Sequence, residues 1–91
     1  MTNRTPTDPY ALGLSALAAT LSDERRAQRF LDLTGIETDE LRSRVGDRQL
    51  LSALIGFLEG HEPDLLAVAG QIGVEPATII AARRELEGFE E

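Results

Sequence analysis

The chain lacks several residue types on which common chemistries depend. It has no cysteine, which excludes a disulfide, a thiolate nucleophile and a thiolate metal site. It has no lysine, which excludes Schiff-base and Walker-type lysine chemistry. His61 is the only histidine, and a lone histidine without cysteine or other histidines does not make a convincing metal site. We therefore interpret His61 as a surface loop residue and expect no metal and no cofactor.

Long apolar runs are also missing. A membrane-spanning helix needs roughly 20 consecutive apolar residues, and no stretch approaches that length. The first seven residues are polar and lack the apolar core of a signal sequence, so we expect a cytoplasmic protein that does not bind membranes. Aromatic residues are few, which predicts an aliphatic core. They are Tyr10, Phe30, Phe57 and Phe89.

Catalytic signatures are absent as well. There is no Gly-rich phosphate loop, nucleophile elbow or triad order. Paired carboxylates such as Asp39 and Glu40 are better explained as exposed residues in the first turn of a helix, because acid–base catalysis needs a cleft that shifts their pKa values. We therefore predict that the protein is not an enzyme and has no catalytic residues.

Negative charge is concentrated in the second half of the chain. The formal net charge is -7. Residues 1–46 carry seven acids and six bases, whereas residues 47–91 carry nine acids and three bases. Such a balance repels phosphate backbones and anionic membranes, so it disfavours nucleic acid as a partner.

Two similar glycine turns indicate the fold class. Gly35 and Gly73 each follow a helix-like run and precede a β-branched residue and a glutamate. A glycine at this point supplies the left-handed C-cap of a helix. No segment shows sustained alternation of period two, so no strands are expected. The pattern predicts an all-α compact bundle of five to six short helices, with residues 1–7 as a disordered tail, residues 8–88 as one helical domain and residues 89–91 as a second tail.

The expected helices follow one another with short links. They start at Asp8-Pro9, after a capping Ser22, at a capping Thr38, at a capping Asp47, at Glu62-Pro63 and at Glu75-Pro76. The nearly all-apolar run Leu50–Leu58 predicts the most buried helix. Within it, Gly56 costs roughly 1 kcal/mol relative to alanine, which favours close helix packing there.

Helical spacing also predicts which side chains face the core. The set comprises Tyr10, Leu14, Leu17 and Leu21 in the first helix, Ala27, Phe30, Leu31 and Thr34 in the second, Leu41 and Val45 in the third, Leu65, Leu66, Val68, Ala69 and Ile72 in the fifth, and Ile79, Ala82 and Leu86 in the sixth.

The last two helices resemble a helix-turn-helix motif. Ala69 allows a close crossing, Gly73 makes the turn, Val74 plugs the core and Ile79 anchors the second helix. Any corner of two helices with a glycine turn gives the same pattern. The early outward positions of the second helix, which include Glu75, are not base readers, and only Arg83 and Arg84 could meet phosphate.

Arginines suggest a second type of surface. Arg25, Arg29 and Arg42, together with neighbouring arginines, could lie near the junction of the second to fourth helices. A solvated face compensated by nearby acids is the simpler interpretation. The alternative is a patch for an acidic partner, in which case replacing these three residues by alanine abolishes its capture.

The last helix adds three candidates. Ile80 is expected to be exposed beside Arg83 and Arg84, which is a modest signal of an interface. The candidate partner-binding residues are therefore Arg25, Arg29, Arg42, Ile80, Arg83 and Arg84.

Several strings are similar to those of one family. Arg29–Ile36, Leu41-Arg42, Phe57-Leu58 and Pro76–Arg83 resemble short all-helical bacterial proteins known as domain of unknown function 3572. The resemblance covers most of residues 10–87. It implies an all-α fold with no known activity, and it supplies no catalytic or binding residues.

Taken with the absences, these features predict a non-enzymatic protein-interaction or regulatory module whose partner is another protein. The alternative is a helix-turn-helix DNA-binding protein that uses residues 62–88.

Overall fold

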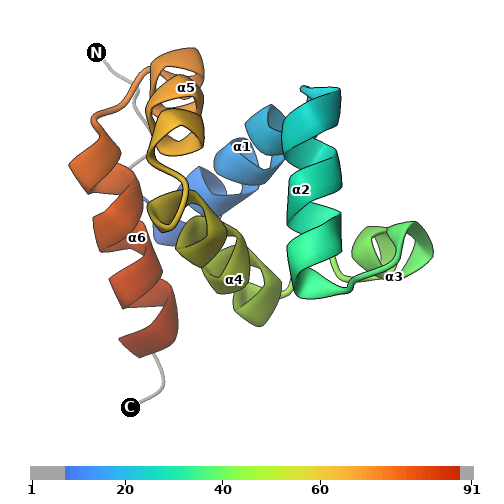
Figure 1. The fold of residues 1–91 in the computed structure, drawn as a ribbon. Helices are drawn as coiled ribbons and strands as arrows, with labels where there is room; N and C mark the ends of the chain where they lie inside the picture. Colours follow the sequence, from blue (N-terminus) through green and yellow to red (C-terminus); the bar gives the residue numbers. More distant parts are fainter. Residues whose placement is uncertain (1–7, 89–91) are drawn as a thin grey trace.

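Six helices joined by links of two to four residues make up the computed structural model, which describes residues 8–88. They are α1 Pro9–Leu21, α2 Glu24–Thr34, α3 Thr38–Ser43, α4 Arg48–Glu59, α5 Glu62–Ile72 and α6 Pro76–Gly88. Residues 8–88 contain no strand, which confirms the predicted all-α bundle (Figure 1). The tails predicted for residues 1–7 and 89–91 lie outside the described residues.

Side-chain caps explain where the first two helices begin. The Asp8 carboxylate accepts a hydrogen bond from the Ala11 backbone N–H at 3.1 Å, and Pro9 occupies the first helical turn. The Asp23 carboxylate accepts from the backbone N–H groups of Arg25 and Arg26. Asp23 therefore caps α2, and the prediction that Ser22 does so was wrong.

Glycine ends α2 and α5 as the repeated turn predicted. Gly35 and Gly73 have φ values of 73° and 77°, in the left-handed region that residues with a side chain rarely adopt. Their N–H groups donate back to the carbonyls of Leu31 and Ala69, respectively. Each turn begins a three-residue link to the next helix, and at Gly73 the chain turns by 97° between α5 and α6.

Helix α4 is the centre of the molecule. It packs against α1, α5 and α6, and these four helices also pack on one another (Figure 1). We call them the body. The predicted central run Leu50–Leu58 is confirmed, because Leu51, Leu54 and Ile55 are completely buried.

A glycine brings α1 and α4 together, although not the predicted one. A Cβ on Gly13 would lie 3.2 Å from the Leu51 Cβ, closer than nine in ten real Cβ contacts. A Cβ on Gly56 would meet only the Arg83 guanidinium, at an ordinary 3.5 Å. Close helix packing therefore depends on Gly13 and not on Gly56.

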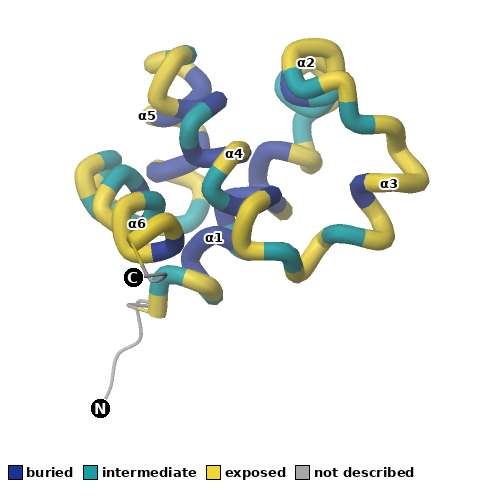
Figure 2. The backbone as a smooth tube through the Cα atoms, turned by 90° about the horizontal axis from the view of Figure 1, so that it is seen from below, coloured by how far each residue is buried: buried dark blue, intermediate teal, exposed yellow. Residues whose placement is uncertain are grey.

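Helices α2 and α3, with the link between them, form a second region that we call the arm (residues 24–43). The arm lies on the opposite side of α4 from α6 (Figure 1). Most of its residues are exposed or half-buried (Figure 2), and its buried residues are Phe30 and Leu41. The arm therefore contributes little to the core.

Several side chains predicted to face the core are exposed instead. They are Tyr10, Leu21, Val45 and Leu66. Helix α1 is apolar on nearly every side, and it turns its small residues inward, with Ala16 and Ala19 buried beside Leu12 and Leu17. Val45 follows the end of α3, and Leu66 lies one position around α5 from the buried stripe. The stripe predicted in α6 is confirmed.

Within residues 8–88, no single helix is both long and apolar enough to cross a membrane. Helices α5 and α6 pass that test only when joined, and they meet at 97°.

Candidate functional site

An ion pair fixes the arm to the body. The Arg29 guanidinium donates to the Asp64 carboxylate at 2.6 Å, linking α2 to the first turn of α5. The Asp64 side chain is 11 % exposed, whereas that of Arg29 is 45 % exposed. Arg29, predicted to bind a partner, thus already has a carboxylate within the chain.

Three aromatic rings in contact also link the arm to the body. Phe30 of the arm meets Phe57 of α4 edge to face, with ring centroids 5.5 Å apart. His61 stacks on the Phe57 ring, with ring centroids 4.7 Å apart. The His61 Nδ1–H donates to the Phe57 carbonyl at 2.9 Å, because a carbonyl can only accept. His61 lies in the link just before α5, as the prediction of a loop residue had it, but it is half-buried and not fully on the surface.

Arg26 provides a third attachment. Its guanidinium donates to the Ala19 carbonyl at the end of α1 at 3.2 Å, and to the Gln71 side chain at 3.4 Å. Gln71 in turn donates to the Ser22 hydroxyl at 3.1 Å. The start of α2 is thus connected to both α1 and α5.

The two aspartates that border the arm are held ionised. Backbone N–H donation, first from Arg26, lowers the pKa of Asp23 at the start of α2. At the other border, the Arg44 guanidinium donates to Asp47 at 2.9 Å, which lowers the pKa of Asp47 and raises that of Arg44. Close by, the Tyr10 hydroxyl donates to the Gly46 carbonyl at 2.9 Å.

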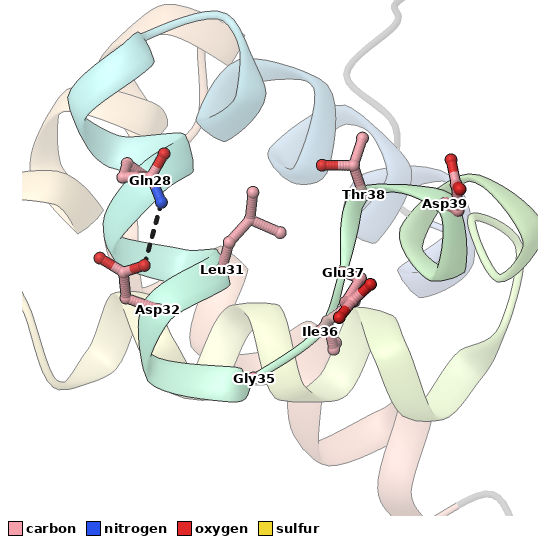
Figure 3. Close-up of a pocket in the computed structure, with 8 residues that line it drawn as sticks. All are labelled: Gln28, Leu31, Asp32, Gly35, Ile36, Glu37, Thr38 and Asp39. Atoms are coloured by element: carbon pink, nitrogen blue, oxygen red, sulfur yellow. Dashed lines mark hydrogen bonds between the residues drawn. The ribbon is translucent and has the colours of Figure 1, made fainter.

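Between these attachments the arm contains an open hollow of about 570 Å³. Figure 3 shows its side chains gathered around the end of α2, the link and the start of α3. We call it the arm hollow, and its lining residues are Gln28, Leu31, Asp32, Gly35, Ile36, Glu37, Thr38 and Asp39.

The arm hollow combines an apolar base with carboxylates. Leu31 and Ile36 are half-buried and pack against the core. Asp32 accepts a hydrogen bond from Gln28 at 2.9 Å (Figure 3), and no arginine lines the hollow. Among residues 8–88, none of the carboxylates of Asp32, Glu37 and Asp39 belongs to an ion pair. Sequence reasoning missed this group because it placed Asp39 only in a solvated first turn.

These carboxylates do not form a metal centre. In the described part of the chain, no group of three or more histidine, aspartate or glutamate side chains is placed to hold a metal ion.

The predicted arginine residues do not gather in one patch. Arg25 and Arg42 are both exposed, but Arg25 lies in the first turn of α2 and Arg42 lies in α3, beyond the other end of α2 (Figure 1). Arg29 is turned to α5 by its ion pair. The structure therefore separates the residues that the sequence placed at one junction.

Helix α6 presents a different surface from the predicted one. Ile80 is half-buried against the core, so the expectation that it is exposed was wrong. Arg83 pairs with Glu59 at 3.0 Å, which joins α6 to α4, and with Glu87 of its own helix at 3.3 Å. Of the candidates in α6, only Arg84 is exposed.

Comparison with known proteins gives one match. No curated protein and no solved structure matches this chain. A family model described as "Protein of unknown function (DUF3572)" matches residues 6–89, which is nearly the whole chain. The chain therefore belongs to the DUF3572 family of proteins of unknown function.

Proposed function

We propose that this protein is a non-enzymatic, cytoplasmic protein-interaction module that contacts its partner through the arm. The observation that carries the proposal is the arm hollow, where half-buried Leu31 and Ile36 lie beside three carboxylates without ion pairs. Partly exposed apolar side chains surrounded by polar groups are the usual composition of a protein interface.

The construction of the arm supports this proposal. Phe30 and Leu41 are its buried residues, whereas its attachment to the body uses polar pairs at defined points. Because few of the arm's side chains are buried, most of its surface is available for recognition. In the body, by comparison, most apolar residues are buried in its own core.

A crosslinking experiment tests the use of the arm. We would place a photoreactive p-benzoylphenylalanine at exposed Thr38 in the arm, and a matched one at exposed Ala67 in α5. The proposal expects a specific protein crosslinked from Thr38, in the presence of nuclease, and not from Ala67. The captured protein, once purified, must bind the wild-type chain. Capture from Ala67 alone would contradict the use of the arm.

DNA binding is the second candidate. It is favoured by the three-residue link and the 97° crossing of α5 and α6, within the roughly 90–120° range of helix-turn-helix pairs. Against it, the exposed residues of α6 include Glu85 and Glu87 beside Arg84, and Arg83 is paired with acids. Binding with so few phosphate contacts is weak at physiological salt.

A salt titration separates the two candidates. Binding of a labelled DNA duplex is measured by fluorescence anisotropy between low and physiological salt. A DNA-binding protein shows saturable binding that falls steeply with salt and is reduced by Arg84→Ala. The interaction module shows no saturable binding at physiological salt.

A further inference from the structure

The geometry of the arm hollow points to the chemistry of its occupant: we propose that it receives a basic segment of a partner protein, in which one apolar side chain is flanked by arginine or lysine. This inference rests on the proposed function and specifies the partner of the same surface.

The charge distribution carries the argument. Asp32, Glu37 and Asp39 come from the end of α2, the link and the start of α3, so three separate segments contribute a carboxylate. Of the other two exposed acids of the arm, Glu40 pairs with Arg44 at 3.3 Å, whereas Glu24 stands alone at the far end of α2 with no ion pair among residues 8–88. The hollow therefore has negative charge without an internal cation, and a cationic partner complements it.

The apolar base restricts the partner further. In Figure 3 the Leu31 side chain extends from α2 toward the space in front of Thr38. Leu31 and Ile36 are neither fully buried nor fully exposed. An apolar side chain of the partner would complete their burial, while its basic neighbours meet the carboxylates. A polycation without an apolar residue would use only part of this surface.

Other occupants fit less well. Nucleic acid and phosphorylated ligands are repelled by the carboxylates. A small molecule is normally enclosed by a mostly apolar pocket, whereas this hollow is open and five of its eight lining residues have polar or acidic side chains.

Two peptides and two protein variants test the inference. The first probe is a fluorescein-labelled peptide with a central leucine, two arginines on each side and Gly-Ser ends; the second has serine in place of that leucine. The arm variant carries Asp32→Lys, Glu37→Lys and Asp39→Lys. The control variant carries Glu62→Lys, Glu75→Lys and Glu85→Lys in the body.

The control matches the arm variant in charge and exposure. Each triple substitution moves the formal net charge from -7 to -1. All six side chains are exposed, and none of them belongs to an ion pair within residues 8–88. Circular dichroism melts of both variants check that each remains folded.

We expect the leucine peptide to bind the wild-type chain at 0.15 M salt. The arm variant should lose about tenfold in affinity or more, which corresponds to about 1.4 kcal/mol, while the control variant stays within about threefold. The serine peptide should bind the wild-type chain more weakly than the leucine peptide does. Equal weakening in both variants would overturn the inference, because attraction by net charge then explains the binding. Absence of binding to the wild-type chain overturns it too.

Further outcomes distinguish this inference from the proposed function. If Thr38 crosslinks a partner whose contact segment is not basic, the inference fails while the arm remains an interaction surface. If sedimentation shows that the wild-type chain self-associates and the arm variant does not, a second copy occupies the hollow and the basic partner is refuted. If the peptide binds as expected but no protein is captured from Thr38, the inference about chemistry stands and the proposed function fails.

Discussion

The body and the arm are both built from helices and differ in how those helices are held in place. In the body, α4 buries Leu50, Leu51, Leu54, Ile55 and Leu58 among three other helices. In the arm, Phe30 and Leu41 are buried. An ion pair and hydrogen bonds provide further attachments to the body. Apolar burial is the main stabilising contribution in folding, so the two regions should differ in local stability.

This difference in burial decides which side chains remain available to a partner. All the large apolar side chains of α4 are buried in the core, so none of them is available to a partner. The arm leaves Leu31, Leu33 and Ile36 partly or largely exposed, and its acids at the hollow have no internal cation. The region that contributes least to the core is therefore the region best suited to recognition.

The largest expected effect comes from removing the ring that attaches the arm. Phe30→Ala should lower the free energy of unfolding by about 3–5 kcal/mol, because a fully buried ring and its contact with Phe57 are lost. Hydrogen exchange should speed up most in residues 24–43 and less in α4. If α4 loses protection as fully as α2, the arm and the body unfold as one cooperative unit, and the expected difference in their local stability is wrong.

Matched substitutions at the two left-handed glycines come next. Gly35→Ala and Gly73→Ala should each cost about 1–2 kcal/mol, because alanine is strained at positive φ. Neither Cβ would meet a neighbour within 4 Å, so the strain is the same at both positions. Hydrogen exchange should place the Gly35→Ala effect in the arm and the Gly73→Ala effect in α5 and α6. If both substitutions reduce protection equally throughout the chain, the arm and the body do not differ in local stability.

The ion pair between the regions should have a smaller effect. A double-mutant cycle with Arg29→Met and Asp64→Asn should give a coupling of about 1 kcal/mol, because Arg29 is half-exposed and solvent screens the pair. Urea denaturation of the four proteins measures it. A coupling near zero would mean that the arm is held by Phe30 and not by this pair.

The smallest effect is expected from titration at the borders of the arm. The pKa values of Asp23 and Asp47 are lowered in the folded protein, so the folded state binds fewer protons than the unfolded state. Their stabilisation is complete above the unfolded pKa near 3.9 and is lost as the pH falls through the lower folded values.

Melting temperatures measured between pH 5 and pH 2 test this prediction. Asp23→Asn keeps a good helix cap but cannot titrate, so it should flatten the acid side of the curve. A matched Asp8→Asn variant serves as a control at another cap. An unchanged slope in Asp23→Asn would show that this carboxylate is not linked to folding.

Local signals in the sequence predicted much of the fold. Gly35 and Gly73 gave the two turns, and the all-apolar run gave α4, because both signals act within a few residues. The buried stripe of α6 followed from helical spacing. By contrast, α1 has apolar residues on nearly every side, so spacing could not select the face that Gly13 presents to α4.

The candidate site was largely beyond sequence reasoning. Arg29 and Asp64 are 35 residues apart, and nothing local pairs them. The arm hollow depends on how α3 is placed against α2, since only that placement brings Asp32 and Asp39 around the same space. The stacking of His61 on Phe57 likewise depends on the turn between α4 and α5.

The hydrogen bond from Tyr10 to Gly46 has a practical consequence. The chain has one tyrosine and no tryptophan, so Tyr10 dominates the intrinsic ultraviolet emission of the whole protein. Its phenol donates to a backbone carbonyl just after α3 ends, and it is 38 % exposed. Separation of this segment from α1 exchanges the carbonyl for water and alters the quantum yield. The unlabelled protein thus contains an optical reporter, located at the exit of the arm, that can be followed in a stopped-flow fluorimeter.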